Sequence, residues 1–483
     1  MFTERHSQWS GLALAAAVSL VAAIPAQAAD SQPAQTSQQE LLEKVNALQA
    51  EVKQLKQAVE KQQQGAAAAE QGPTAAALSR DATQYDRFGL EPIHGFHAAY
   101  RGGRFVIQDD AGQFSLHPWV QSQFRYESTY RDNAKAGVHA DTQSGFELRR
   151  VKFGFDGFIL TPDLTYKFQW QVDRTTGQFS LEGASGQYRL PNTPFYVIAG
   201  QFKGPIDHEQ LLASRYLTAT DRTLTNDEFT GAEGFVQGAG GGFDNGGPVR
   251  GQLVYTDGRL SINTNYENFP TGANTANYGV AGRVEAKAFG NWKDYDFSTG
   301  AYGATADFLV GGVGADYSEA GDTHVLTHVI DVDYGTKAGF AFYGAYTGRA
   351  YSHAAIGSIG AIGGTTGKTI GTNGYDWSAR AQVSYAINSR WEPFGQYEFI
   401  YLDKTNLPAL AKNEIQVLRA GINYYLYGPV ARISAEADYL PGGSPINDTG
   451  NGILATGAPT KTSGFTQGGG NEFIFRVQFQ LAL

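Results

Sequence analysis

Apolar and polar residues alternate along much of this chain, most clearly in Phe146–Leu160. Within this stretch the apolar residues Val151 and Phe153 alternate with the basic residues Arg150 and Lys152. Because successive side chains of a β-strand point to opposite faces, the stretch predicts a strand with one apolar and one charged face. Such a strand fits a water-soluble sheet over a buried core, and it also fits a membrane barrel with lipid outside and water inside.

The same alternation recurs in short runs from about Tyr85 to the carboxyl end, and clusters of Gly, Asn, Asp and Pro separate the runs. At roughly 20–25 residues per strand and turn, this region predicts an antiparallel β-barrel of about 16 strands, with 18 as the alternative. Gly238–Gly242 is predicted to lie in a loop. The other strand candidates are Thr165–Asp173, Trp119–Tyr126, Phe195–Gln201, Gly251–Tyr255, Leu260–Glu267, Val280–Ala288, Thr323–Tyr334, Gly339–Tyr346, Trp377–Ile387, Trp391–Tyr401, Ile415–Tyr427, Ala431–Tyr439 and Glu472–Leu483.

The last of these candidates favours the membrane barrel over the soluble sheet. In Glu472–Leu483, Phe475 and Val477 alternate with Arg476 and Gln478 up to the carboxyl end. The last strand of a membrane barrel closes against the first, which leaves no edge with unpaired backbone groups in lipid. We therefore predict an all-β transmembrane barrel.

The segments before the barrel differ from it in composition. Residues 1–28 predict a secretory signal peptide, because an apolar core precedes the small-residue cleavage site Ala26–Ala28. Residues 65–84 predict a flexible linker, and residues 85–483 the barrel domain. Residues 29–64 predict a short periplasmic coiled-coil helix, with a solitary amphipathic helix as the alternative. Valine at a and leucine at d favour a dimeric coil, and these positions are Leu41, Val45, Leu48, Val52, Leu55 and Val59.

Composition narrows the function classes. Aromatic residues make up 13% of the 483 residues and glycine numbers 60, which suits twisted strands with rings at membrane interfaces. The chain has no cysteine, which excludes disulfides, thiol catalysis and cysteine-based metal sites. A net charge of −10 argues against nucleic-acid binding. We predict no enzymatic activity, cofactor or metal, because no nucleophile elbow or phosphate-binding loop is found, and His324 and His328 stand about 13 Å apart on a strand.

Three blocks resemble the phosphate-selective porins O and P. They are Phe146–Leu160 with Thr165–Asp173, Ile198–Ile206 with the following His208–Leu217 and Asp221-Arg222, and Asn423–Arg432. The resemblance spans most of the predicted barrel, although the family's Ser-Ser-Arg stands here as Ala213-Ser214-Arg215 and its Glu-Arg as Asp221-Arg222. It implies a homotrimeric, 16-stranded porin in the outer membrane of a Gram-negative cell. Each subunit would hold a pore in which arginines and lysines guide small anions, phosphate first, past an inward-folded loop.

The inward-folded loop is expected around Asp207–Leu217, which predicts a short helix that begins at Asp207 and leaves Arg215 facing water. A fixed charge at a narrow point selects the sign of the ion that passes. One alternative is a surface loop whose arginines pair with Asp207, Glu209 and Asp221. Another is a structural or adhesive barrel tethered through its N-terminal coil. The candidate anion-pore residues are Arg150, Lys152, Lys167, Lys203, Ser214, Arg215 and Arg222, and most other charged residues on the lumen face are expected to pair with one another.

Overall fold

The computed structural model describes residues 95–101, 104–131, 142–173, 176–230, 234–258, 276–297, 299–320, 323–354, 372–404, 413–442 and 470–483. These ranges belong to one compact unit, Leu90–Leu483. The predicted signal peptide, coiled coil and linker lie outside the described residues, as does the predicted strand Leu260–Glu267.

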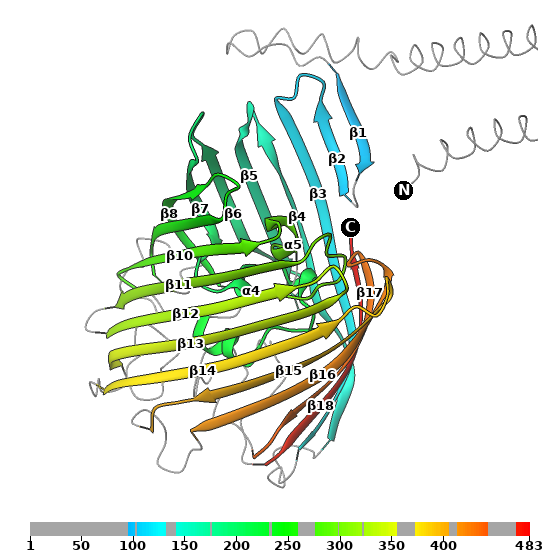
Figure 1. The fold of residues 1–483 in the computed structure, drawn as a ribbon, viewed down its shortest axis with the longest axis vertical. Coiled ribbons are helices and arrows are strands. Elements are labelled where there is room, and N and C mark those ends of the chain that lie inside the picture. The colour runs from blue at the N-terminus through cyan, green and yellow to red at the C-terminus, as the bar shows by residue number, and fades with distance from the viewer. Residues whose placement is uncertain are drawn as a thin grey trace, which may run out of the picture. The chain divides into compact units, whose positions relative to one another are not determined.

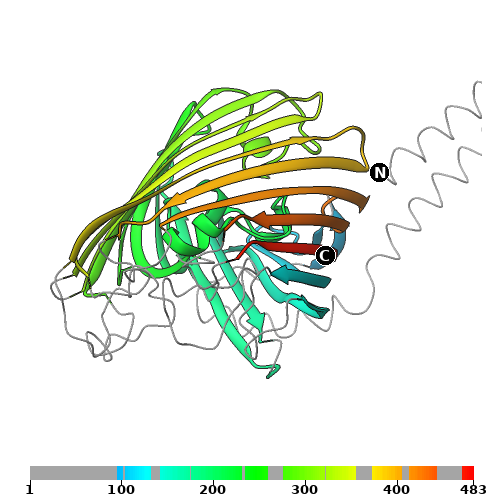
Figure 2. The ribbon, with the colours of Figure 1, turned by 90° about the horizontal axis from the view of Figure 1, so that it is seen from below.

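Sixteen strands, β3 to β18, form a closed antiparallel barrel in which consecutive strands pair (Figure 1, Figure 2). β3 and β18 close it, with a register that runs from Gln121↔Ala482 to Arg131↔Glu472. The predicted 16-stranded barrel is thereby confirmed. The strands are β3 (Phe114–Arg131), β4 (Thr142–Ile159), β5 (Thr161–Val172), β6 (Phe179–Arg189), β7 (Phe195–Lys203), β8 (Phe235–Asp244), β9 (Val249–Thr256), β10 (Tyr278–Phe289), β11 (Phe308–Ala320), β12 (Thr323–Gly335), β13 (Phe340–Ala354), β14 (Thr372–Tyr385), β15 (Trp391–Tyr401), β16 (Glu414–Tyr427), β17 (Ala431–Leu440) and β18 (Glu472–Ala482).

Two further strands form a hairpin at the start of the unit, β1 (Phe96–Arg101) and β2 (Arg104–Asp109). The hairpin joins the barrel through two residue pairs between β2 and the beginning of β3, Ile107↔Leu116 and Gln108↔Ser115. It therefore extends the same edge of β3 that β18 occupies further along. This position explains why the sheet has eighteen strands while sixteen of them close the barrel.

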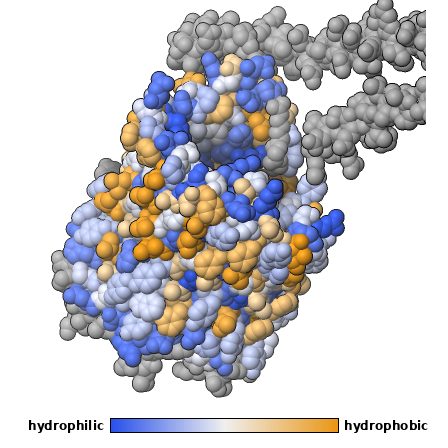
Figure 3. Space-filling model, viewed as in Figure 1, coloured by the Kyte–Doolittle hydropathy of each residue, from blue (hydrophilic) through white to orange (hydrophobic). Residues whose placement is uncertain are grey.

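The period-two pattern of the sequence separates an apolar outer face from a polar inner face. On β18, Phe475 and Val477 are exposed on the outside, whereas Arg476 and Gln478 are buried. A lipid-facing surface tolerates exposed apolar side chains and a water-filled lumen does not, so this arrangement suits a membrane barrel. Figure 3 shows apolar side chains spread over much of the outer wall that faces the viewer.

A β-bulge on β4 interrupts the alternation. Gln123 of β3 pairs with Arg150, but the next residue, Phe124, pairs with Leu148, so Arg149 is the extra residue. A bulge lets two consecutive side chains point to the same face. Arg149 and Arg150 are consequently both buried inside the barrel, a placement that strict alternation does not predict.

The prediction of a loop at Gly238–Gly242 is wrong, because these residues belong to β8 and pair with both β7 and β9. The glycines allow close approach of the neighbouring strand. A Cβ added to Gly240 would lie 2.2 Å from the backbone oxygen of Leu253, which no side chain permits. A glycine-rich strand shows no apolar alternation, so the sequence pattern missed it.

Two connections carry short helical segments. The β7–β8 connection contains α4 (His208–Leu211), the 3₁₀ turn η2 (Ser214–Tyr216) and the π-turn η3 (Asn226–Thr230), and the β10–β11 connection contains α5 (Trp292–Tyr295). Within the described ranges, no helix combines the length and the apolar character that crossing a membrane would require.

Candidate functional site

The β7–β8 connection lies inside the barrel, and we call its described residues 204–230 the inner loop (Figure 2). Almost every residue of the inner loop is buried, including the polar residues Asp207, Thr220 and Thr225 at 0% exposure. Polar groups are buried without large cost only when they are hydrogen-bonded or ion-paired. The inner wall of the barrel supplies these partners, so the loop is held along its whole length.

The helix predicted from Asp207 begins where expected. The Asp207 side chain caps α4 by accepting a hydrogen bond from the Glu209 N–H at 3.1 Å. Arg380 pairs with the same carboxylate at 2.5 Å and Tyr343 donates to it at 3.1 Å. Burial raises the pKa of Asp207, but the neighbouring guanidiniums of Arg380 and Arg283 lower it more, so the pKa lies below its ordinary value.

The predicted helix is shorter than Asp207–Leu217, because it ends at Leu211 after one turn. Lys203 of β7 donates from its Nζ to the carbonyl oxygens of Gln210 and Leu212, each at 2.6 Å. Arg222 donates to the Leu212 carbonyl oxygen at 2.7 Å. These cations satisfy carbonyl groups left without partners at the helix end. Lys203 and Arg222, both predicted to line the pore, therefore hold the inner loop in shape.

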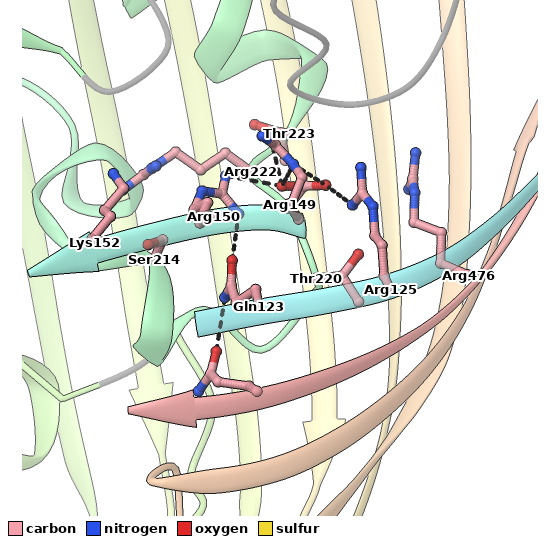
Figure 4. A network of polar contacts seen from close by, with 12 residues as sticks. Gln123, Arg125, Arg149, Arg150, Lys152, Ser214, Thr220, Arg222, Thr223 and Arg476 are labelled. Carbon is pink, nitrogen blue, oxygen red and sulfur yellow. Dashed lines mark hydrogen bonds and ion pairs between the residues drawn. The ribbon is translucent and has the colours of Figure 1, made fainter. Parts of the chain in front are cut away.

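One buried carboxylate, Asp221, holds the inner loop to β3 and β4. Arg125 reaches it at 2.5 Å, Arg149 at 3.0 Å and Arg150 at 2.9 Å. Figure 4 shows these side chains pointing from the two strands toward the loop. Arg419 also donates to the Asp221 backbone oxygen at 3.1 Å. Burial raises the pKa of the Asp221 carboxyl, but Arg149, Arg125 and Arg150 together lower it well below its ordinary value.

Carboxylates of the barrel wall bind the backbone of the inner loop. Glu436 accepts from the Thr220 N–H at 2.8 Å, and Glu398 accepts from the Leu224 N–H at 3.1 Å and the Thr225 N–H at 2.5 Å. Arg349 pairs with Glu228 of the loop at 2.9 Å. Charged acceptors make stronger hydrogen bonds than neutral ones. The end of the loop is thus fixed as firmly as its beginning.

Apolar packing inside the barrel adds to this attachment. Leu224 and Phe229 of the inner loop join a buried cluster with residues of several strands. Fully burying one such side chain contributes about 1.5–3 kcal/mol. The strand residues of the cluster are Val325, Tyr351, Ile400, Ile415, Val417, Leu440 and Ile474.

The seven predicted anion-pore residues fall into two groups. Arg150 contacts Asp221, and Lys152 pairs with Glu182 at 2.9 Å. Lys203 and Arg222 bind carbonyl groups as described above. Ser214 shares a hydrogen bond with Gln121 at 3.1 Å. Among the residues that the structure describes, the side chains of Lys167 and Arg215 form neither an ion pair nor a hydrogen bond, and these two make up the second group.

Arg215 is held by aromatic rings. Its guanidinium carbon lies 4.9 Å from the ring centroid of Trp119 and 5.0 Å from that of Tyr216, distances typical of cation–π contacts. Trp119 pairs across the sheet with Gly154, where a Cβ would come within 2.7 Å of the indole ring, so the glycine makes room for it. Gln480 donates to the Arg215 carbonyl oxygen at 3.0 Å and fixes the backbone.

Arg215 and Lys167 line the same cavity of about 440 Å³ beside the inner loop. Its lining contains twice as many lysines and arginines as carboxylates, so the cavity is locally basic although the whole chain carries a net charge of −10. Screening in water limits the range of a fixed charge to about 8–10 Å, so the lining residues, more than the net charge of the chain, set the electrostatic potential in the cavity. The charged lining residues are Arg104, Lys152, Lys167, Lys203, Arg215 and Arg250, with Asp156, Glu285 and Asp296.

Sequence reasoning missed several residues of this site, among them Trp119, Arg250 and Arg104. Trp119 is on the same face of β3 as the lumen residues Gln121 and Arg125, so strict alternation could have identified it. Arg250 lies just before the predicted strand Gly251–Tyr255 and carries no distinguishing signal. Arg104 enters the cavity from β2, which no pattern in the sequence connects to the pore.

The fold resembles those of bacterial porins. An anion-selective porin from Comamonas acidovorans matches with a TM-score of 0.53 and 12% sequence identity, over 77% of this chain and 100% of that chain. The outer-membrane channel DcaP of Acinetobacter baumannii matches at 0.46 and 12% over 77% of this chain and 99% of that chain. OmpF of Salmonella typhi matches at 0.48 and 11% over 76% and 98%. The sequence matches no protein-family model and no curated protein. The first likeness shows that the chain has the architecture of an outer-membrane porin.

Proposed function

We propose that this protein is a passive porin of the outer membrane, through which small anions diffuse, with phosphate or a related oxyanion as the preferred solute. The closed barrel with its apolar outer face supports a membrane channel. The inner loop beside a basic cavity supports selection of anions at a narrow point. We further propose a homotrimer embedded in the lipid bilayer, with residues 29–64 as a coiled coil in the periplasm.

One observation carries the anion preference, namely that aromatic rings hold Arg215 where carboxylates hold the cavity cations Lys152 and Arg250. An ion-paired arginine presents little net charge to a passing ion. A guanidinium between Trp119 and Tyr216 keeps its full charge, and its buried Nε has no hydrogen-bond partner among the described residues. The planar guanidinium donates two parallel hydrogen bonds to an oxyanion, which is the reason for placing phosphate first.

Reversal potentials of the purified protein in planar lipid bilayers under a KCl gradient test the anion preference. A unit charge about 5 Å from the ion path contributes about 0.8 kcal/mol in water and about half of that in physiological salt. Because it acts on the anion and the cation in opposite directions, the permeability ratio changes about fourfold. We expect Arg215→Gln to lower the chloride-to-potassium ratio by about this factor. Arg390→Gln, which changes an exposed arginine in the β14–β15 turn, is the matched control and should leave the ratio unchanged.

Other outcomes separate the parts of the proposal. Cation preference of the wild-type channel would refute the anion claim. Phosphate added to a chloride solution should reduce the chloride current more than sulfate at the same concentration, and equal reduction would refute the phosphate preference. A correctly folded barrel without any conductance would instead support a structural or adhesive protein.

A further inference from the structure

The β10–β11 connection also enters the barrel, and we call its residues 290–297 and 299–307 the lumen strap. Its first turn, α5, is capped by Asn291, which accepts from the Asp294 N–H at 2.8 Å. Asp294 in turn accepts from the backbone N–H groups of Thr305 and Ala306, each at 3.0 Å, which ties the two ends of the strap together. The strap is therefore a defined structure and Tyr295 within it is fully buried.

The lumen strap contacts the inner loop at three places. The Tyr295 ring stacks on His208 of α4 with centroids 4.0 Å apart. The hydroxyls of Thr299 and Thr218 lie 3.3 Å apart. The Phe297 ring packs against Tyr216 at 5.0 Å.

The strap also reaches strands far from its own. Gln382 of β14 donates to the Thr299 carbonyl oxygen at 3.2 Å. Tyr302 stacks on Tyr425 of β16 with centroids 3.6 Å apart and donates to the Ser389 carbonyl oxygen at 2.9 Å. A segment that leaves β10, contacts the inner loop, and touches β14 and β16 before it returns to β11 must lie across part of the lumen.

We propose that the lumen strap is the second half of the constriction, and that Phe297 and Asp296 are specificity-determining residues acting in opposite directions. This inference rests on the proposed anion channel. Phe297 positions Arg215 and so strengthens anion preference. Asp296 neutralises a second cation of the cavity, Arg250, and so weakens it.

The role of Phe297 follows from the order of contacts. Arg215 lies against Trp119 on the barrel wall and against Tyr216 on the inner loop. Tyr216 is backed by Phe297 of the strap, and all four side chains line one cavity of about 230 Å³. Without the Phe297 ring, Tyr216 loses its support and Arg215 can turn toward nearby carboxylates, which would cancel its charge.

The role of Asp296 follows from its geometry with Arg250 of β9. The two side chains form a bidentate pair, with Nη2–Oδ1 at 2.5 Å and Nη1–Oδ2 at 2.9 Å. Arg250 also pairs with Glu285 at 2.6 Å and lies 4.1 Å from the Trp292 ring centroid. If Asp296 loses its charge, Glu285 and the ring still hold Arg250 in the cavity, and its positive charge is compensated less.

The test compares reversal potentials of strap variants in the full-length channel under a KCl gradient. We expect Phe297→Ala to lower the chloride-to-potassium permeability ratio about twofold and Asp296→Asn to raise it about twofold, since each alters part of one screened charge. Phe297→Tyr keeps the ring and should keep the ratio. Lys293→Gln changes an exposed charge on the same short helix, outside the cavity lining, and is the control that should have no effect.

A double variant separates this inference from the proposed function. In the Arg215→Gln background, Phe297→Ala should cause no further change, because the residue it positions is gone. If Arg215→Gln lowers the ratio but Phe297→Ala and Asp296→Asn do not shift it in their expected directions, the strap inference is overturned and the anion channel stands. If Arg215→Gln itself has no effect, the proposed function fails first.

A disulfide test checks the placement of the strap independently of transport. Because the chain has no cysteine, the pair Thr218→Cys with Thr299→Cys introduces the only two thiols. Oxidation should join them, detected as a mobility shift that reductant reverses. The control pair Thr218→Cys with Thr305→Cys places the second thiol at the far end of the strap and should not join. Failure of the first pair to cross-link in the folded barrel would overturn the contact.

Discussion

Arg125, Arg149 and Arg150 surround the buried carboxylate of Asp221, whereas Arg215 lies between the rings of Trp119 and Tyr216. Both arrangements fix an arginine inside the same lumen. The Asp221 carboxylate fixes the three guanidiniums and offsets part of their positive charge, while the rings that hold Arg215 offset none of its charge. The partner of a lumen arginine, more than its presence, therefore decides whether its charge is bound to the inner loop or faces the cavity.

The two arrangements also differ in what they cost. Moving a charge from water into the protein interior costs free energy. Breaking a buried ion pair also costs free energy, because one partner is left uncompensated. Arg125 and Arg150 are almost fully buried, while Arg215 is partly exposed to the cavity. Stability should therefore depend on the cluster around Asp221, and selectivity on Arg215.

The largest expected effect is on stability, from Asp221→Asn. This change leaves Arg125, Arg149 and Arg150 near a neutral group and should lower the free energy of unfolding by about 3–5 kcal/mol. Urea unfolding of the barrel in lipid vesicles measures it. Asp110→Asn, which removes an exposed carboxylate paired with His97, is the control and should cost about 1 kcal/mol or less. Equal losses would contradict the anchoring role of Asp221.

The next largest effect comes from replacing each of the two kinds of arginine by glutamine and comparing the two variants. Arg150→Gln should lower the free energy of unfolding by about 1.5–3 kcal/mol, which is the contribution of a charged hydrogen bond. It should change the chloride-to-potassium permeability ratio less than Arg215→Gln does. Arg215→Gln should cost only about 1–2 kcal/mol for two ring contacts. Urea unfolding and reversal potentials are measured on both variants, and the opposite ranking would show that Arg150 acts on selectivity and Arg215 on stability.

A smaller effect is expected from Lys167→Gln. Lys167 lines the cavity with Arg215 and has no carboxylate pair among the described residues, but its side chain is more exposed to water. Water and salt screen an exposed charge more strongly. The permeability ratio should fall about twofold, less than for Arg215→Gln, and the difference should shrink in 1 M salt, where screening acts within about 3 Å.

The smallest effect is expected from mild acid. Burial raises the pKa values of Asp207 and Asp221, but the adjacent arginines lower these pKa values by more. Both pKa values therefore lie below the ordinary value of 3.8. A carboxyl with a depressed folded-state pKa contributes stability that is present above its unfolded pKa and is lost only as pH falls through the lower folded value. Asp207 and Asp221 should therefore contribute nothing to any change in conductance between pH 7 and about pH 4. A transition within that window that Asp207→Asn or Asp221→Asn abolishes would show that these carboxylates do not anchor the inner loop as charged groups.

Local patterns in the sequence predicted much of the barrel and part of the site. Alternation in Phe146–Leu160 identified a strand with Arg150 and Lys152 inside, and Asp207 was identified as the start of a helix. The sequence pattern did not predict the bulge at Arg149 or the glycine-rich strand β8, because neither follows the period of two on which the prediction depends. The predicted N-terminal segments stay predictions, since they lie outside the described residues.

The amino-acid sequence by itself determined the strands, the polarity of their two faces and the presence of many basic residues in the lumen, because these features arise from neighbours a few positions apart. Which of these cations have a carboxylate beside them, and which do not, follows from the tertiary structure alone. That choice depends on contacts between distant residues, such as Thr220 with Glu436 across 216 positions and Gln121 with Ser214 across 93. Barrel closure and the inward path of two connections create these contacts, so Arg215 meets rings while Arg150 meets a carboxylate.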